Sequence, residues 1–196
     1  ELFEQQVELS PDSPAISFQG TDISYAELNK RSNQLAHALL QLGLQANQPV
    51  AILLQDGPQQ IVSLLGVIKA GGVIACLDPE HPTARIRNIV KQTRPPVVIT
   101  DDDSHERCRQ LVDSQDSSFL GVLLLESDAT RTVTPDTDGA AVACIDIEAQ
   151  PDINPDLLMD PYDPVYIVYT SGSTGEPKGI VQSHRSFCQF IEWQSQ

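Results

Sequence analysis

Short apolar runs alternate with amphipathic segments in the first two thirds of the chain. The runs are apolar throughout rather than at every second position, which is typical of strands buried on both faces. They occupy residues 50–54, 73–77, 97–99 and 121–125. Apolar residues at helical spacing predict helices over residues 24–42, from Pro58 until Gly71 and Gly72 end the helix, and over 82–94 and 102–113. This alternation predicts an α/β fold, with a mostly parallel sheet that carries helices on both faces.

Two of these helices have clear signals for their ends and their buried faces. Ser24 and Glu27 form a capping box, in which each side chain satisfies a free backbone N–H at the start of the helix. Gly43 ends that helix, and Pro58 opens the next one. The predicted buried stripes are Leu28, Leu35, Leu39 and Leu42 in the first helix, and Ile61, Leu64, Leu65 and Ile68 in the second.

The chain changes character over residues 127–163, where aspartate, threonine, proline and alanine are common. Prolines interrupt the segment, so we expect an acidic loop region over the surface. Its one short apolar stretch, residues 141–147, is a candidate strand. Beyond it, β-branched and aromatic residues predict a strand over 165–169, and a shorter apolar run predicts another at 180–181.

The last predicted element is a helix capped by Ser183. Phe187, Phe190 and Ile191 lie on one side of it at helical spacing. We expect these aromatic rings, together with Trp193, to pack in the core or against a subdomain rather than to form a base-stacking platform, because aromatic side chains dominate burial.

Composition and charge narrow the classes of partner. The chain has 196 residues, 40% of them hydrophobic, which suits one globular domain with its own core. Acidic residues outnumber basic ones 27 to 12, which gives a formal net charge of −15. Such a field repels nucleic acid and anionic membranes, so we expect neither as a partner. No apolar run reaches the roughly 18 residues that a membrane-spanning helix needs.

The four cysteines, Cys76, Cys108, Cys144 and Cys188, lie far apart in the sequence. None stands in a C-x-x-C pair or at ligand spacing from a histidine, so we expect no metal site and no disulfide framework. Cys76 and Cys144 lie within apolar runs and are predicted to be small buried residues. The pattern is typical of a protein of the reducing cytoplasm.

The candidate chemistry lies in the loop between the last two predicted strands. Residues 170–179 read Thr-Ser-Gly-Ser-Thr-Gly-Glu-Pro-Lys-Gly. Glycines let the main chain approach a ligand closely, so that successive N–H groups can point at one anion. The hydroxyls are uncharged donors, and the lysine adds a mobile positive charge. The pattern predicts a phosphate-binding loop, with contacts from Thr170, Ser171, Gly172, Ser173, Thr174, Gly175 and Lys178.

Other interpretations of this loop fit less well. A plain turn between strands needs only about two to five residues. A P-loop places its lysine directly after a glycine, whereas Pro177 precedes Lys178 here. The dinucleotide-binding pattern G-x-G-x-x-G is absent as well. Simple kinases, GTPases and dehydrogenases are therefore disfavoured.

Residues 169–179 closely resemble the signature loop of the adenylate-forming (AMP-binding) enzymes, which comprise acyl-CoA synthetases, luciferases and the adenylation domains of nonribosomal peptide synthetases. Residues 23–28 and 68–79 resemble two further motifs of the family in order and spacing, although Cys76 stands where the family usually has proline. Residues 11–16 are similar to the peptide synthetase branch in particular, as are residues 77–82. The resemblance covers residues 1–196 as a partial adenylation domain, namely the N-terminal subdomain of the adenylate-forming fold.

The resemblance implies an activity. In the family, ATP with Mg²⁺ activates a carboxylate, such as an amino acid, as an acyl-adenylate, and the acyl group passes to a phosphopantetheine thiol on a carrier domain or to coenzyme A. The loop would hold the β- and γ-phosphates and stabilise charge rather than transfer protons. The resemblance places the metal-binding acid, the ribose-binding aspartate and the catalytic lysine beyond Gln196, so no catalytic residue is expected here. The chain has no initiator Met and ends at Ser195 and Gln196, inside a predicted helix, so both ends look like cuts in a longer protein. We expect the chain by itself to be inactive.

Two alternatives stay open: a fragment of an acyl-CoA synthetase, and a truncated, catalytically inactive nucleotide-binding remnant. Outside the loop, we expect structural roles. As a lone histidine with no evident acid or nucleophile beside it, His184 is interpreted as structural. Asp78, just before a proline, is expected to form a turn, and Lys69 is expected to complement the dipole at the end of its helix.

Overall fold

The computed structural model describes residues 2–111, 119–125, 130–133, 145–171 and 177–194. Within these residues, a seven-stranded sheet has the order β7-β6-β5-β3-β4-β8-β9. Its neighbouring parallel strands are β6 (Gly121–Leu125), β5 (Val97–Thr100), β3 (Pro49–Leu53), β4 (Val73–Cys76) and β8 (Pro164–Ser171). At the two edges, β7 (Thr130–Val133) and β9 (Pro177–Ser183) pair antiparallel. The predicted α/β fold with a mostly parallel sheet is confirmed.

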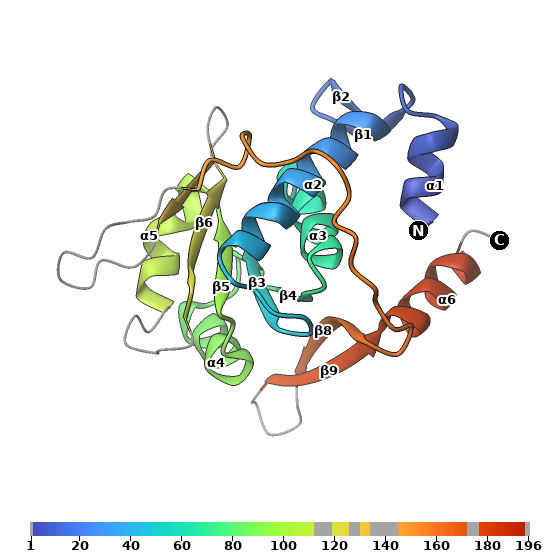
Figure 1. Ribbon diagram of the computed structural model, residues 1–196. Helices are drawn as coiled ribbons and strands as arrows, with labels where there is room; N and C mark the ends of the chain where they lie inside the picture. The colour runs from blue at the N-terminus through green and yellow to red at the C-terminus, as the bar shows by residue number, and fades with distance from the viewer. Residues whose placement is uncertain (1, 112–118, 126–129, 134–144, 172–176, 195–196) are drawn as a thin grey trace.

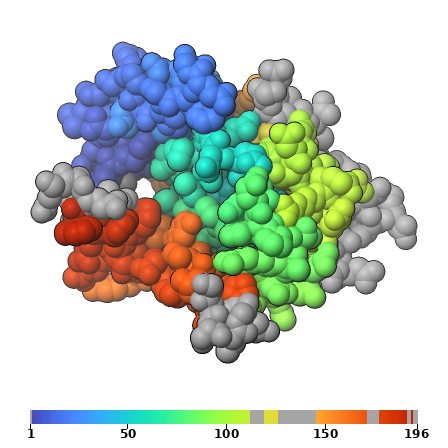
Figure 2. Space-filling model, turned by 180° about the vertical axis from the view of Figure 1, so that it is seen from behind, coloured from blue at the N-terminus to red at the C-terminus, as the bar shows by residue number. Residues whose placement is uncertain are grey.

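Helices cover both faces of the sheet, as predicted. α2 (Tyr25–Gln41) and α3 (Pro58–Lys69) pack on one face, and α4 (Thr83–Thr93) and α5 (Asp102–Leu111) on the other. Figure 1 looks onto α2, and Figure 2 shows α4 and α5 from behind. Alternate residues of β3 belong to two different hydrophobic cores, one on each face of the sheet, because successive side chains of a strand point to opposite faces. Val50 and Ile52 pack with the first helix pair, whereas Ala51 and Leu53 pack with the second.

The start of α2 agrees with the Ser24 half of the predicted capping box. The backbone N–H of Glu27 donates to the Ser24 hydroxyl over 3.2 Å, so Ser24 is the N-cap. The Glu27 carboxylate pairs with Arg31, four residues along the helix. Leu28, Leu35 and Leu39 are buried, as predicted, and Leu42 is half-buried against the same cluster.

The predicted stripe of α3 is wrong in part. Ile61 is exposed, and Leu64, Leu65 and Ile68 are only half-buried. The buried residues of the helix are Val62, Ser63, Gly66, Val67 and Lys69. The reason lies in the close approach of α3 to α2, since a Cβ on Gly66 would come within 2.8 Å of Leu35 Cδ2. Gly66 faces α2 at this contact, and the larger apolar residues Leu64, Leu65 and Ile68 are only partly buried.

The N-terminal region contains structure that the apolar pattern did not predict. α1 (Leu2–Leu9) precedes an antiparallel hairpin of β1 (Pro14–Phe18) and β2 (Thr21–Ser24). Gln19 and Gly20, which join the two strands, both have positive φ, of 49° and 81°. Two left-handed residues between strands match the twist of a tight hairpin. The glycine was the available signal for this turn.

The acidic region is partly a loop, as predicted. Residues 145–163 form no helix or strand and run along α2 (Figure 1). We call residues 145–163 the strap. Three α2 side chains form hydrogen bonds with its backbone carbonyls: Asn33 with that of Asp152, Gln34 with that of Glu148, and His37 with that of Ile153. Residues 130–133, predicted as loop, instead form the edge strand β7. Of the candidate strand 141–147, residues 141–144 lie outside the described residues, and 145–147 are not in a strand.

The aromatic residues of α6 (His184–Gln194) are more exposed than predicted. Phe190 and Trp193 are 53% and 72% exposed, although Phe187 is half-buried. The helix contacts β8 and β9 at one edge of the sheet, and its first turn contacts residues 161–163. Phe190 and Trp193 are therefore not in the core of the described residues, and their packing against a further subdomain stays a prediction.

Candidate phosphate-binding site

The predicted loop lies at the turn end of the hairpin formed by β8 and β9. The two strands pair with Tyr169 opposite Gly179, Thr170 opposite Lys178, and Ser171 opposite Pro177. Sequence-predicted residues on both arms of the loop are thus brought together. Gly172, Ser173, Thr174 and Gly175 lie outside the described residues, so their contacts remain predictions. The described part of the site is the mouth of the loop.

Thr170 and Lys178 point to the same face of this hairpin, because directly opposed residues of an antiparallel pair share a face. Both side chains are exposed. They place a hydroxyl donor and an ammonium side by side at the start of the loop, a combination that suits a phosphate oxygen. The next pair on the same face, Val168 and Ile180, is apolar and is 39% and 47% exposed.

Gly179 lies at a close approach inside the hairpin. A Cβ at this position would lie 3.2 Å from Cε1 of Tyr169 and 3.2 Å from Cγ2 of Ile167. The phenol ring therefore packs over the glycine, on the face opposite to that of Thr170 and Lys178. The sequence pattern suggested ligand approach as the reason for this glycine, whereas the structure shows that it makes room for a side chain of the hairpin itself.

Two ionisable side chains near the base of the hairpin, Tyr166 and Cys76, have raised pKa values. Burial raises the pKa of Tyr166 above its ordinary value, and the neighbouring Cys76 raises it further. Burial likewise raises the pKa of Cys76, although its hydrogen bond with Tyr166 acts in the opposite direction. Cys76 is half-buried rather than fully buried as predicted, and Cys144 lies outside the described residues. Both groups are protonated at neutral pH and offer no nucleophile.

His184 lies at the other end of the hairpin. Its backbone N–H donates to the Asp163 carbonyl over 3.0 Å, at the start of α6. Burial lowers the pKa of His184, against the opposing charge of Asp163. Asp78 forms the expected turn, because its Oδ1 accepts from the backbone N–H of Glu80 over 2.8 Å. Within the described residues, no group of three or more histidine, cysteine or carboxylate side chains is placed to hold a metal ion.

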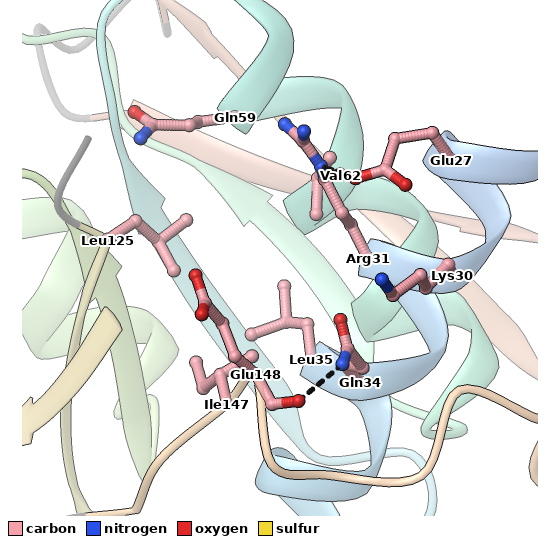
Figure 3. Close-up of a pocket in the computed structure, with 10 residues that line it drawn as sticks. All are labelled: Glu27, Lys30, Arg31, Gln34, Leu35, Gln59, Val62, Leu125, Ile147 and Glu148. Atoms are coloured by element: carbon pink, nitrogen blue, oxygen red, sulfur yellow. Dashed lines mark hydrogen bonds and ion pairs between the residues drawn. The ribbon is translucent and has the colours of Figure 1, made fainter. Parts of the chain in front are cut away.

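A cavity of about 420 Å³ lies between α2, α3 and the strap (Figure 3). Its lining residues are Glu27, Lys30, Arg31, Gln34, Leu35, Gln59, Val62, Leu125, Ile147 and Glu148. The sequence pattern gave no sign of this cavity, because a row of polar residues on a helix is usually its solvated face. Two acidic and two basic side chains line it, and Arg31 already pairs with Glu27 over 2.6 Å. The lining therefore shows no preference for an anion.

Comparison with known proteins agrees with the fold and identifies the family. The AMP-binding enzyme family model matches residues 3–196. The chain is 36% identical to one of the linear gramicidin synthase proteins of Brevibacillus parabrevis over 186 residues, which cover 95% of this chain and 2% of that protein. The chain belongs to the AMP-binding enzyme family.

Solved structures show the same fold. The nonribosomal peptide synthetase FmoA3 in its α-methyl-L-serine-AMP-bound form matches with a TM-score of 0.76 and 23% identity, over 97% of this chain and 18% of that one. The anthranilate CoA ligase AuaEII in complex with anthranoyl-AMP matches with a TM-score of 0.79 and 18% identity, over 97% of this chain and 35% of that one. The chain thus spans a small part of the length of the proteins it matches. Within the described residues, no helix is both long and apolar enough to cross a membrane.

Proposed function

We propose that this chain forms the N-terminal part of an adenylation domain, in which residues 170–179 bind the β- and γ-phosphates of ATP. The observation that supports the proposal is the pairing of Thr170 with Lys178, exposed on one face at the mouth of the hairpin. Membership of the AMP-binding family supports ATP as the nucleotide. The similarity to a linear gramicidin synthase protein supports an amino acid as the carboxylate.

The proposed reaction transfers an adenylyl group to a carboxylate. A carboxylate oxygen attacks the α-phosphorus, the bond from that phosphorus to the bridging oxygen breaks, and pyrophosphate leaves with the electron pair. Negative charge therefore grows on the leaving group in the transition state. Lys178 contributes a positive charge and Thr170 an uncharged donor, and both stabilise that charge without transferring a proton.

Mg²⁺ would neutralise phosphate charge when bound. The described residues hold no group of three or more candidate metal ligands. This chain's own contribution is positioning: Thr170 and Lys178, on two paired strands, present their side chains on one face of the hairpin.

A lysine substitution in a complete adenylation domain tests the proposal. Lys178→Ala should reduce amino-acid-dependent exchange of pyrophosphate into ATP by about 10²- to 10³-fold, the usual cost of removing one preorganised charge-stabilising group. Lys30→Ala is the matched control, because Lys30 is also exposed but lines the α2 cavity. Unchanged pyrophosphate exchange in Lys178→Ala would refute the role of the hairpin. A loss of exchange confined to Lys30→Ala would indicate that the phosphates bind in the α2 cavity instead.

The acceptor of the acyl group separates two versions of the proposal. Transfer to a phosphopantetheine thiol of a carrier domain is favoured, because the 36% identity is to a peptide synthetase, whereas the CoA ligase shares the fold at 18% identity. Loading of radiolabelled amino acid onto a carrier domain would support this version. Release of the label as a coenzyme A thioester would support the second. A domain that binds ATP but exchanges no pyrophosphate with any carboxylate would be the inactive remnant.

A further inference from the structure

The side chain of Tyr169 links the start of the candidate loop to the neighbouring helix α4. Its phenol oxygen is hydrogen-bonded to Oγ1 of Thr93, the last residue of α4, and the two residues are 76 apart in sequence. Figure 1 shows the turn end of the hairpin beside α4, and α4 contacts β9. Tyr169 immediately precedes Thr170, so this bond is one residue away from the proposed phosphate contact.

The direction of the hydrogen bonds follows from the donors available. The Thr93 hydroxyl donates to the carbonyl of Ile89 over 2.8 Å, one helical turn earlier. A hydroxyl has a single hydrogen to donate, so Thr93 must accept from the phenol of Tyr169. The result is a directed chain, from Tyr169 to Thr93 to the Ile89 carbonyl. Removing the Thr93 hydroxyl would leave a half-buried phenol without its acceptor.

The anchor itself is rigid. Ile86, Ile89 and Val90 place one face of α4 in the core that also contains Leu53 and Val98, and Tyr169 packs against this cluster. The end of the helix is fixed as well, since Arg94 adopts a left-handed conformation, with φ 47°, and its N–H donates to the Val90 carbonyl over 2.8 Å. The bond to Thr93 thus connects the hairpin to a part of the molecule that cannot easily shift.

Successive side chains of a strand point to opposite faces, so fixing Tyr169 on one face also fixes the direction of its neighbour Thr170 on the other. Tyr169 and Gly179 lie on the α4 face of the hairpin, and Thr170 and Lys178 on the opposite face. The Tyr169 ring also covers Gly179, so the single side chain restrains both strands immediately before the mouth of the loop. A rotation of the hairpin about its long axis would turn Thr170 and Lys178 away, and the phenol bond opposes this rotation.

We propose that Tyr169 and Thr93 are positioning residues for ATP: their hydroxyl pair sets the direction in which Thr170 and Lys178 present their side chains to the phosphates. The inference rests on the proposed function of the hairpin. Neither hydroxyl contacts the nucleotide in this arrangement, and each acts through the residues of the mouth.

The test uses Thr93→Val, Thr93→Ser and Tyr169→Phe in a complete adenylation domain, with KM measured separately for ATP and for the amino acid. Thr93→Val and Tyr169→Phe should each lower kcat/KM for ATP by about 10- to 100-fold, the scale expected for misplacement of a binding group, and leave KM for the amino acid unchanged. Thr93→Ser keeps the acceptor and should behave like wild type. The double variant should be no worse than either single one, because both remove the same bond.

Thr100→Val is the matched control. Thr100 is buried and its hydroxyl donates to the Leu53 carbonyl over 3.0 Å, so the same substitution removes a comparable bond inside the core. Equal loss of kcat/KM for ATP in Thr100→Val and Thr93→Val, or a loss in Thr93→Val that Thr93→Ser shares, would overturn the inference. Should Thr93→Val fail to fold, Tyr169→Phe decides alone, since it keeps the ring over Gly179.

Lys178→Ala in the same assay separates the two proposals. A large loss of kcat/KM for ATP in Lys178→Ala, with wild-type behaviour of Thr93→Val and Tyr169→Phe, would reject the positioning role and keep the phosphate site.

Discussion

Lys69 and Glu4 form an ion pair, with 2.9 Å between Nζ and Oε1, that joins the end of α3 to the N-terminal helix. The lysine side chain is only 6% exposed, and its ammonium also donates to Oδ1 of Asn154 in the strap over 2.6 Å. Lys69 lies in the last turn of α3, where the helix dipole favours a cation, as predicted. Sequence position did not show that this cation also connects three separate segments of the chain.

Substitution of Lys69 should therefore destabilise the whole N-terminal half. Lys69→Met keeps most of the side-chain volume and leaves the Glu4 carboxylate and Asn154 without their shared donor. We expect a loss of about 1–3 kcal/mol in the free energy of unfolding, less than the roughly 3–5 kcal/mol of a fully buried pair, because Glu4 is still 32% exposed and keeps other interactions. Urea unfolding followed by circular dichroism measures it. Lys91→Met, at an exposed position of α4, should cost almost nothing, and equal costs for the two substitutions would contradict the assignment.

The same pair predicts a pH dependence of stability. Burial alone would raise the pKa of Glu4, but hydrogen bonds with the N-terminal amine of the chain and with Lys69, and the positive charges of both, leave the pKa below its ordinary value of 4.5. The unfolded state then binds a proton more readily than the folded state, so the contribution of Glu4 is complete above that value and is lost as pH falls through the lower, folded pKa.

Unfolding of wild type and of Glu4→Gln should be compared between about pH 6 and pH 3. The stability advantage of wild type should shrink as pH falls, because a protonated Glu4 resembles glutamine. Asp12→Asn, at an exposed position, controls for general effects of net charge. A wild-type advantage that is constant over this range would show that Glu4 has no lowered pKa.

Gly66 should not tolerate a side chain. Its Cβ would lie 2.8 Å from Cδ2 and 2.9 Å from Cγ of Leu35, at the contact between α3 and α2. Overpacking costs about 1–3 kcal/mol, and alanine recovers about 1 kcal/mol of helix propensity. We expect Gly66→Ala to lower the midpoint of thermal unfolding, and Leu35→Val to restore part of it in the double variant. For Gly57→Ala the corresponding contacts, to the Phe18 ring, are an ordinary 3.8 Å, so a drop as large as that of Gly66→Ala would argue against the steric explanation.

The apolar pattern could predict the parallel sheet, the helices on both faces and the capped start of α2, because each depends on periodicity or on a local cap. It could not predict the buried side of α3, since that side is set by how closely Leu35 approaches Gly66. The loop motif likewise identified Thr170 and Lys178, and only the register of β8 and β9 shows that they face each other. The Tyr169–Thr93 bond joins residues 76 apart, and no local pattern encodes such a contact.

Cys108 should react with thiol reagents only after unfolding. It is 1% exposed on α5, within the core beneath α4, and burial raises the pKa of its thiol to about 12. At pH 8 the thiolate fraction is then about 10⁻⁴, and the thiolate is the reactive species. Iodoacetamide should modify Cys108 at least about 100-fold more slowly in buffer than in denaturing urea, as measured by mass spectrometry of the peptides.

The half-buried Cys188 on α6 provides an internal comparison and should be labelled before Cys108. Modification of Cys108 that keeps pace with Cys188 under native conditions would mean that the α4–α5 core opens locally, and this would also remove the rigid support that the Thr93 anchor requires.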